Sequence, residues 1–259
     1  MRKHVLVLMA ALALSGCGDD APGPGAAASS SGDGLSGTLT VFSAASLTDV
    51  FTDLGDQLEA DNPGLDVQFN FAGSSALATQ LTQGAPADVF ASANQAQMKV
   101  VTDAALQAAA PIVFTSNVLE IAVPKGNPGG ITGLADFARP DLTLAVCAPD
   151  VPCGAAASAV FADAGIIAQP DTEEEDVKAA LTKVQLGEVD AALVYATDVR
   201  AGGDDVEGIE FAEAEQEVNE YPICTLAAAP NPAAAQAFVD LVQSDAGQRA
   251  LTDAGFRAP

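Results

Sequence analysis

The chain has 259 residues, of which 35 are acidic and 10 are basic, so its formal net charge at pH 7 is −25. A surface this acidic argues against nucleic acid as a partner and against charge-driven binding to anionic lipid head groups. The only histidine is His4, and no lysine stands three residues after a serine. Because an imidazole is missing from the body of the chain, a Ser-His-Asp triad and a histidine-ligated zinc site are disfavoured. The composition therefore argues against hydrolases and metalloenzymes, and we expect no enzyme and no bound cation.

The N-terminus has the pattern of an export signal. Arg2 and Lys3 form a basic start, and residues 5–14 are an apolar run. That run is shorter than the roughly 20 residues that a membrane-spanning helix needs. Residues 14–17, Leu-Ser-Gly-Cys, resemble the lipobox of bacterial lipoproteins. We predict a signal peptide over 1–16 and lipidation of Cys17; the alternative is an ordinary secretory peptide with an incidental cysteine.

The segment that follows is typical of a tether. Residues 17–37 are rich in Gly, Ala, Ser and Pro and contain few bulky apolar side chains, which predicts a flexible linker. We expect an exported protein, held by its lipid on the outer face of the cell membrane. Loss of Arg2 and Lys3 changes the net charge from −25 to −27. Surface charges farther away than about 8–10 Å are largely screened, so this acidity does not exclude an anionic ligand.

Helical and extended patterns alternate along the first half of the chain. Residues 65–71 alternate strictly between apolar and polar, which predicts a strand, whereas 47–58 have helical spacing that ends at Asn62-Pro63-Gly64. The predicted strands are 39–42, 65–71, a short one reached through 84–90, and an extended run over 112–123. The predicted helices are 47–58, 75–83 and 95–103.

The second half repeats the alternation. The predicted strands are 142–147, 191–195, 209–212 and the extended run 221–226. The predicted helices are 133–138, 154–164, 175–186, 233–243 and 245–253. Strands alternating with helices predict an α/β protein with parallel sheets covered on both faces. We expect lobe I to comprise 38–117 and 223–259 and lobe II to comprise 118–222, with two crossings as a hinge and a ligand cleft between the lobes.

Three cysteines remain after Cys17. Cys147 and Cys153 are close in the sequence, and export permits a disulfide. We favour a Cys147–Cys153 pair, which leaves Cys224 as a small buried hydrophobe. A Cys147–Cys224 bridge is the alternative.

Two serines stand where a predicted strand gives way to a predicted helix, Ser46 and Ser74. The first N–H groups of a helix have no partner within it, and a serine hydroxyl adds another donor, so the pair suggests an anion site. The alternative is plain N-capping, for which serine is common.

Other groups also face the expected cleft. Residues 151–155 and 173–178 each open a predicted helix in the second half. We interpret the acidic side chains of 173–176 as solvated first-turn acids, because they lack the spacing of a calcium loop. Tyr195 is either a core residue or a donor at the cleft.

Several short motifs together resemble a known family. They occur, in order, at residues 44–47, 73–75, 84–90, 151–154, 175–177, 194–195 and 221–222. From about residue 38 to the C-terminus the chain is similar to the molybdate-binding proteins of ABC uptake transporters, which have the type 2 periplasmic-binding-protein fold. The resemblance departs at Cys153, where the family usually has alanine.

The resemblance implies a site for a tetrahedral oxyanion. It implies hydroxyl and N–H donors at Ser46 and Ser74, backbone N–H donors at Cys153 and Val177, and a hydroxyl donor at Tyr195. A cage of donors suits a fully deprotonated dianion, and closure of the lobes would complete it.

The function expected from this resemblance is the capture of molybdate, with tungstate as a second ligand, and its delivery to a membrane permease by a monomeric protein without a cofactor. The alternative within the fold is another tetrahedral oxyanion, such as sulfate or phosphate. A ferric iron binder is disfavoured because only two tyrosines, Tyr195 and Tyr221, are present. A purely structural lipoprotein would not need so many donor-bearing helix starts.

Overall fold

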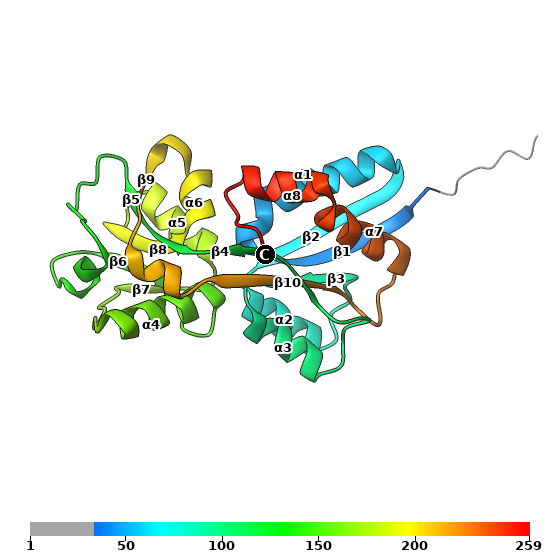
Figure 1. The fold of residues 1–259 in the computed structure, drawn as a ribbon, viewed down its shortest axis with the longest axis horizontal. Coiled ribbons are helices and arrows are strands. Elements are labelled where there is room, and N and C mark those ends of the chain that lie inside the picture. Colours follow the sequence, from blue (N-terminus) through cyan, green and yellow to red (C-terminus); the bar gives the residue numbers. More distant parts are fainter. Residues whose placement is uncertain (1–33) are drawn as a thin grey trace, which may run out of the picture. The chain divides into compact units, whose positions relative to one another are not determined.

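The computed structural model describes residues 34–259. The predicted signal peptide, Cys17 and most of the predicted linker lie outside the described residues. The described chain forms two five-stranded sheets, each with its own helices (Figure 1). β1 already begins at Ser36, so the predicted linker ends slightly earlier than Gly37.

The first sheet has the strand order β2-β1-β3-β10-β4. Its strands are β1 (Ser36–Ala44), β2 (Gly64–Ala72), β3 (Val89–Ala91), β4 (Ile112–Asn117) and β10 (Asn219–Thr225). Its helices are α1 (Thr48–Asp61), α2 (Ser74–Thr82), α3 (Gln95–Asp103), α7 (Pro232–Gln243) and α8 (Asp245–Asp253). Helices α1, α7 and α8 lie on one face and α2 and α3 on the other (Figure 1).

Apolar side chains at helical spacing hold these layers together. In α1 the buried positions are Val50, Phe51, Leu54 and Leu58, which pack into the core on the α7 side of the sheet. A second core under α2 and α3 includes Leu77 and other buried residues. Burial of apolar surface on both faces is what the sequence predicts for an α/β sheet, and the structure confirms it.

The second sheet has the order β7-β6-β8-β5-β9. Its strands are β5 (Leu119–Pro124), β6 (Leu144–Cys147), β7 (Thr172–Glu174), β8 (Ala191–Tyr195) and β9 (Val206–Ile209). Its helices are α4 (Pro152–Ala164), α5 (Val177–Gln185) and α6 (Ala196–Ala201), with short 3₁₀ turns at Leu134–Ala138, Gly203–Asp205 and Ala212–Gln216. A further 3₁₀ turn, Ala45–Leu47, lies between β1 and α1 beside the first sheet.

Both sheets are mixed, which corrects the prediction of parallel sheets. In the first sheet β1 pairs in parallel with β2 and β3, but β10 is antiparallel to β3 and β4. In the second sheet β6 is parallel to β7 and β8, whereas β5 is antiparallel to β8 and β9. The strands that run against the rest of their sheets are β10 and β5, the first strands that the two connecting runs form in the lobe they enter. Each run enters its sheet from the other lobe and therefore in the opposite direction.

The extended run over 112–123 crosses between the lobes, as predicted, and breaks at Val118. The Asn117 side chain explains the break, since its Oδ1 accepts the Val118 N–H at 3.0 Å and its Nδ2 donates to Thr197 Oγ1 at 2.8 Å. The chain returns to the first sheet in β10. Two crossings therefore join the lobes, as expected for a two-segment hinge.

Three short elements differ from the predictions. The strand expected near 209–212 is β9, and residues 212–216 form a 3₁₀ turn instead. Strand β7 and helix α6 were not predicted. With three and six residues, these elements are too short for periodicity to reveal them.

Candidate anion site between the lobes

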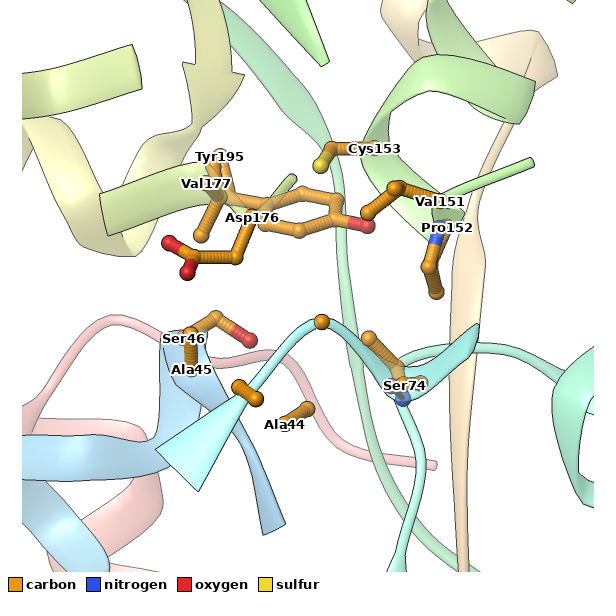
Figure 2. Close-up of a pocket in the computed structure, with 13 residues that line it drawn as sticks. Ala44, Ala45, Ser46, Ser74, Val151, Pro152, Cys153, Asp176, Val177 and Tyr195 are labelled. Atoms are coloured by element: carbon orange, nitrogen blue, oxygen red, sulfur yellow. Dashed lines mark hydrogen bonds between the residues drawn. The ribbon is translucent and has the colours of Figure 1, made fainter. Parts of the chain in front are cut away.

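A small cavity lies where the two lobes meet, at the carboxyl ends of β1, β2, β6, β7 and β8 (Figure 2). The space in it that is open to the centre of a water-sized sphere is about 10 Å³. Its lining consists of Ala44, Ala45, Ser46, Ala72, Gly73, Ser74, Ala93, Val151, Pro152, Cys153, Asp176, Val177 and Tyr195. The cavity thus brings together all five predicted site residues. This space is close to the roughly 10–15 Å³ that one bound water needs, so the cavity excludes drug-sized organic ligands and admits only a small species.

Ser46 lies in the 3₁₀ turn that follows β1, and its side chain is 7% exposed. Its Oγ lies 2.9 Å from the hydroxyl of Tyr221, and it makes no capping bond to the helix. Burial raises the pKa of Tyr221, so this phenol stays protonated and can donate. When Tyr221 donates to Ser46 Oγ, the serine proton is free to point into the cavity.

Ser74 is the first residue of α2 and is 1% exposed. The helix cap is Gly73, so the capping explanation fails for Ser74 as it does for Ser46. The backbone N–H of Ala93 donates to Ser74 Oγ at 3.0 Å. An acceptor site of Oγ is therefore occupied from the protein side, and the Ser74 proton is available to a ligand.

Two helix starts on the second lobe face the same cavity. Cys153 is the second residue of α4 after Pro152, and Val177 is the first residue of α5. Their N–H groups belong to the first turn of a helix and have no partner within it. Proline at the first position removes one N–H that would otherwise need a partner.

Tyr195 ends β8 and is 1% exposed. Among the described residues, no group forms a hydrogen bond with its hydroxyl. Burial, with the nearby Tyr221 and Asp198, raises the pKa of Tyr195 well above its usual value. A neutral phenol with an unused proton at a cavity wall is a donor for an acceptor that enters the cavity.

The lining of the cavity carries few charged side chains. It has no lysine or arginine, and its one carboxylate, Asp176, caps α5 by accepting the Ala179 N–H at 2.9 Å. This corrects the interpretation of residues 173–176 as first-turn acids, because Thr172–Glu174 form β7 and Asp176 precedes the helix. Attraction for an anion must therefore come from helix-start N–H dipoles and hydroxyls.

A buried carboxyl group lies behind Tyr195. Asp198 is fully buried, and its Oδ2 accepts the Tyr195 N–H at 3.2 Å. Burial raises its pKa to about 7, although Lys178 Nζ, 3.7 Å from Oδ1, favours the charged form. Near neutral pH this group is partly protonated, which reduces negative charge close to the site.

A disulfide joins Cys147 and Cys153, as favoured from the sequence. The alternative bridge to Cys224 is wrong, because Cys224 is a free, buried thiol whose pKa is raised to about 12 by burial. The disulfide ties the end of β6 to the first turn of α4. Gly154 fits this closed loop because a Cβ there would collide with the backbone oxygens of Ala148 and Cys147.

Sequence reasoning missed the groups that prepare the serines. Neither the motif at 221–222 nor the count of tyrosines indicates that Tyr221 contacts Ser46, and the N–H of Ala93 has no signal in the sequence. Both act from β10 and the end of β3, which are distant in sequence from the serines. Such support could have been found only from the strand order.

Within residues 34–259, no group of three or more His, Cys, Asp or Glu side chains is arranged to hold a metal ion. In the same part of the chain, none of the helices has the length and apolar character needed to span a bilayer.

Sequence comparison shows where the chain belongs. Residues 39–257 match the family of bacterial extracellular solute-binding proteins. The molybdate-binding protein ModA of Mycobacterium tuberculosis H37Rv is 44% identical over 255 residues, which cover 97% of each chain. The molybdate-binding protein ModA of Escherichia coli K12 is 32% identical over 234 residues, covering 85% of this chain and 89% of the relative.

Solved structures agree on the fold. The periplasmic molybdate-binding protein of Azotobacter vinelandii superposes with a TM-score of 0.73 at 18% identity, covering 85% of this chain and 99% of that one. The sulfate-binding protein SubI of M. tuberculosis H37Rv gives a TM-score of 0.71 at 18% identity, with coverages of 85% and 86%. These likenesses establish the type 2 periplasmic-binding-protein fold. The chain belongs to the bacterial extracellular solute-binding proteins, in the family of the molybdate-binding protein ModA.

Proposed function

We propose that this protein captures molybdate, and also tungstate, outside the cytoplasm and delivers it to the permease of an ABC transporter. The groups that donate hydrogen bonds to the oxyanion are the hydroxyls of Ser46, Ser74 and Tyr195 and the backbone N–H groups at Cys153 and Val177. The protein acts as a binder and not as an enzyme. We place lobe I at 36–117 with 219–259 and lobe II at 118–218, because β1 begins at Ser36 and β10 begins at Asn219, which shifts the boundaries predicted at 38 and 223.

One observation supports this proposal above the others. The Ala93 N–H donates to Ser74 Oγ on the first lobe, and the buried Tyr195 hydroxyl on the second lobe has no hydrogen-bond partner in the described chain. Ser46 Oγ shares a hydrogen bond with the Tyr221 hydroxyl, in which either group can donate. Hydroxyl protons are thus available on both lobes around one small cavity. Hydrogen bonds to a charged acceptor are stronger than neutral ones. A fully deprotonated tetrahedral dianion can accept from all of these donors at once.

The same set of donors favours a fully deprotonated oxyanion over a protonated one. The cavity is built from donors, and the Asp176 carboxylate is engaged by the Ala179 N–H. A protonated oxyanion would place its own proton against another donor and lose a hydrogen bond. Sulfate has the same charge and shape as molybdate, so only the size of the closed cavity separates the two.

The membrane attachment is a separate part of the proposal. We place the lipid on Cys17 and expect a monomer held on the outer face of the membrane. The support is the lipobox pattern and the extracellular family to which the chain belongs.

Isothermal titration with molybdate, tungstate, sulfate and phosphate tests the ligand. We expect tight binding of molybdate and tungstate, because fully deprotonated tetrahedral dianions can accept hydrogen bonds from all of the proposed donors. Sulfate and phosphate should bind much more weakly. Tight sulfate binding without a molybdate response would contradict the assignment and favour the alternative oxyanion.

A further inference from the structure

Backbone from the two lobes meets directly beside the cavity. Gly73, at the end of β2, lies against the carbonyl group of Glu175, which precedes α5. A Cβ built on Gly73 would approach this carbonyl oxygen to well under 3.0 Å, a distance that real Cβ atoms do not show. The contact therefore exists only because residue 73 has no side chain.

The conformation of Gly73 itself does not require glycine. Its φ of −58° and ψ of 135° lie in a region open to every L-residue. Alanine would therefore fit the backbone of the first lobe alone. The conflict arises only when Glu175 of the second lobe is in place.

The contact stands between the donors of the two lobes. Gly73 directly precedes Ser74, and Glu175 is two residues before Val177. A separation at this point moves the first turn of α2 away from the first turn of α5. It would thus lengthen hydrogen bonds to any anion that both lobes share, and such bonds weaken steeply with poor geometry.

Other contacts across the cleft are more adaptable. Lys178 Nζ lies 2.9 Å from Asp49 Oδ2, and Gln97 Nε2 donates to the Asp150 carbonyl at 2.9 Å. Both use long side chains, which can follow a shift of the lobes. The Gly73 contact involves backbone on both sides and cannot adjust without moving a lobe.

We infer that Gly73 sets the distance at which the lobes stop closing, and thereby the size of the closed anion cavity. It is a positioning residue that touches the second lobe, and its side-chain hydrogen leaves room for the Glu175 carbonyl. The inference rests on the proposed anion function. Beyond the five proposed donors, Gly73 would then affect anion binding only in the closed form.

The test compares Gly73→Ala and Gly73→Val with wild type in the purified chain. Molybdate affinity should fall about 10- to 100-fold in Gly73→Ala, the loss expected when a hydrogen bond to a charged ligand is broken, and further in Gly73→Val. Small-angle X-ray scattering should show a smaller contraction with saturating molybdate than in wild type. The urea midpoint of the unliganded variants should fall by no more than the small cost of replacing glycine at the cap of α2.

Gly133→Ala is the matched control. Gly133 has φ of 166°, which is ordinary extended backbone, and a Cβ there meets no atom within 4 Å. It lies outside the cavity lining, so this variant should bind and contract like wild type.

The outcomes separate the two proposals. Wild type that binds none of the four oxyanions would overturn the function and this inference with it. Wild-type affinity and contraction in both Gly73 variants would overturn the inference alone. A lowered urea midpoint without ligand, together with wild-type contraction on molybdate, would assign the glycine to the cap of α2 alone and equally overturn it.

Discussion

At the scale of single residues, the site depends on hydroxyl groups that are prepared by neighbours. Ser46 and Ser74 are both buried, and each Oγ is engaged from inside the protein. Tyr195 differs because its buried hydroxyl has no partner among residues 34–259. Leaving a buried polar group unpaired costs about 1–3 kcal/mol, so this hydroxyl carries a cost until an acceptor arrives.

Tyr195→Phe separates binding from folding. The change should weaken molybdate binding by about 1–3 kcal/mol and leave the free energy of unfolding of the unliganded protein unchanged or higher, because the lost hydroxyl had no partner. Titration and urea unfolding measure the two effects. A large loss of stability with unchanged affinity would show that Tyr195 is only a core residue.

Ser46→Ala and Ser74→Ala should each weaken molybdate binding by about 1–3 kcal/mol, since each removes one donor to a charged ligand. Ser75→Ala is the matched control, because Ser75 neighbours Ser74 on α2 but does not line the cavity. Equal affinity in all three variants and wild type would remove the serines from the site.

At the scale of elements, the site is a set of strand ends followed by helix starts. Serine at both first-lobe turns could be recognised from the sequence, because strand and helix patterns meet there. The capping alternative could be rejected only from the structure, which places Gly73 at the cap of α2. The short elements β7 and α6 lack a readable period, and Asp176 was therefore misinterpreted.

The Cys147–Cys153 disulfide holds one of these helix starts. Its loss through Cys147→Ala/Cys153→Ala should lower the free energy of unfolding by about 2 kcal/mol, as expected for a short closed loop. Molybdate binding should weaken as well, since the N–H groups at the start of α4 would lose a fixed position. Thermal unfolding and titration provide the two measurements.

Chemical reduction of the Cys147–Cys153 disulfide provides the control for the double variant. Reductant should lower the melting temperature and affinity of wild type but leave the double variant unchanged. A wild-type protein whose affinity does not respond to full reduction would show that the disulfide stabilises the loop without serving the site.

At the scale of the whole molecule, the alternation of strands and helices predicted two lobes and the two crossings. It did not predict that both sheets are mixed, because strand direction depends on where the long runs at 112–123 and 221–226 enter. The five residues expected at the ligand do line one cavity. The contact of Gly73 with Glu175 is a product of lobe closure and has no signature in local sequence.

The central claim is that one dianion is shared between the lobes at this cavity. Anomalous X-ray diffraction at the molybdenum edge, from crystals grown with saturating molybdate, locates the metal atom directly. We expect one dominant peak, enclosed by Ser46, Ser74, Cys153, Val177 and Tyr195. A dominant peak elsewhere, or no peak in this cavity, would contradict it.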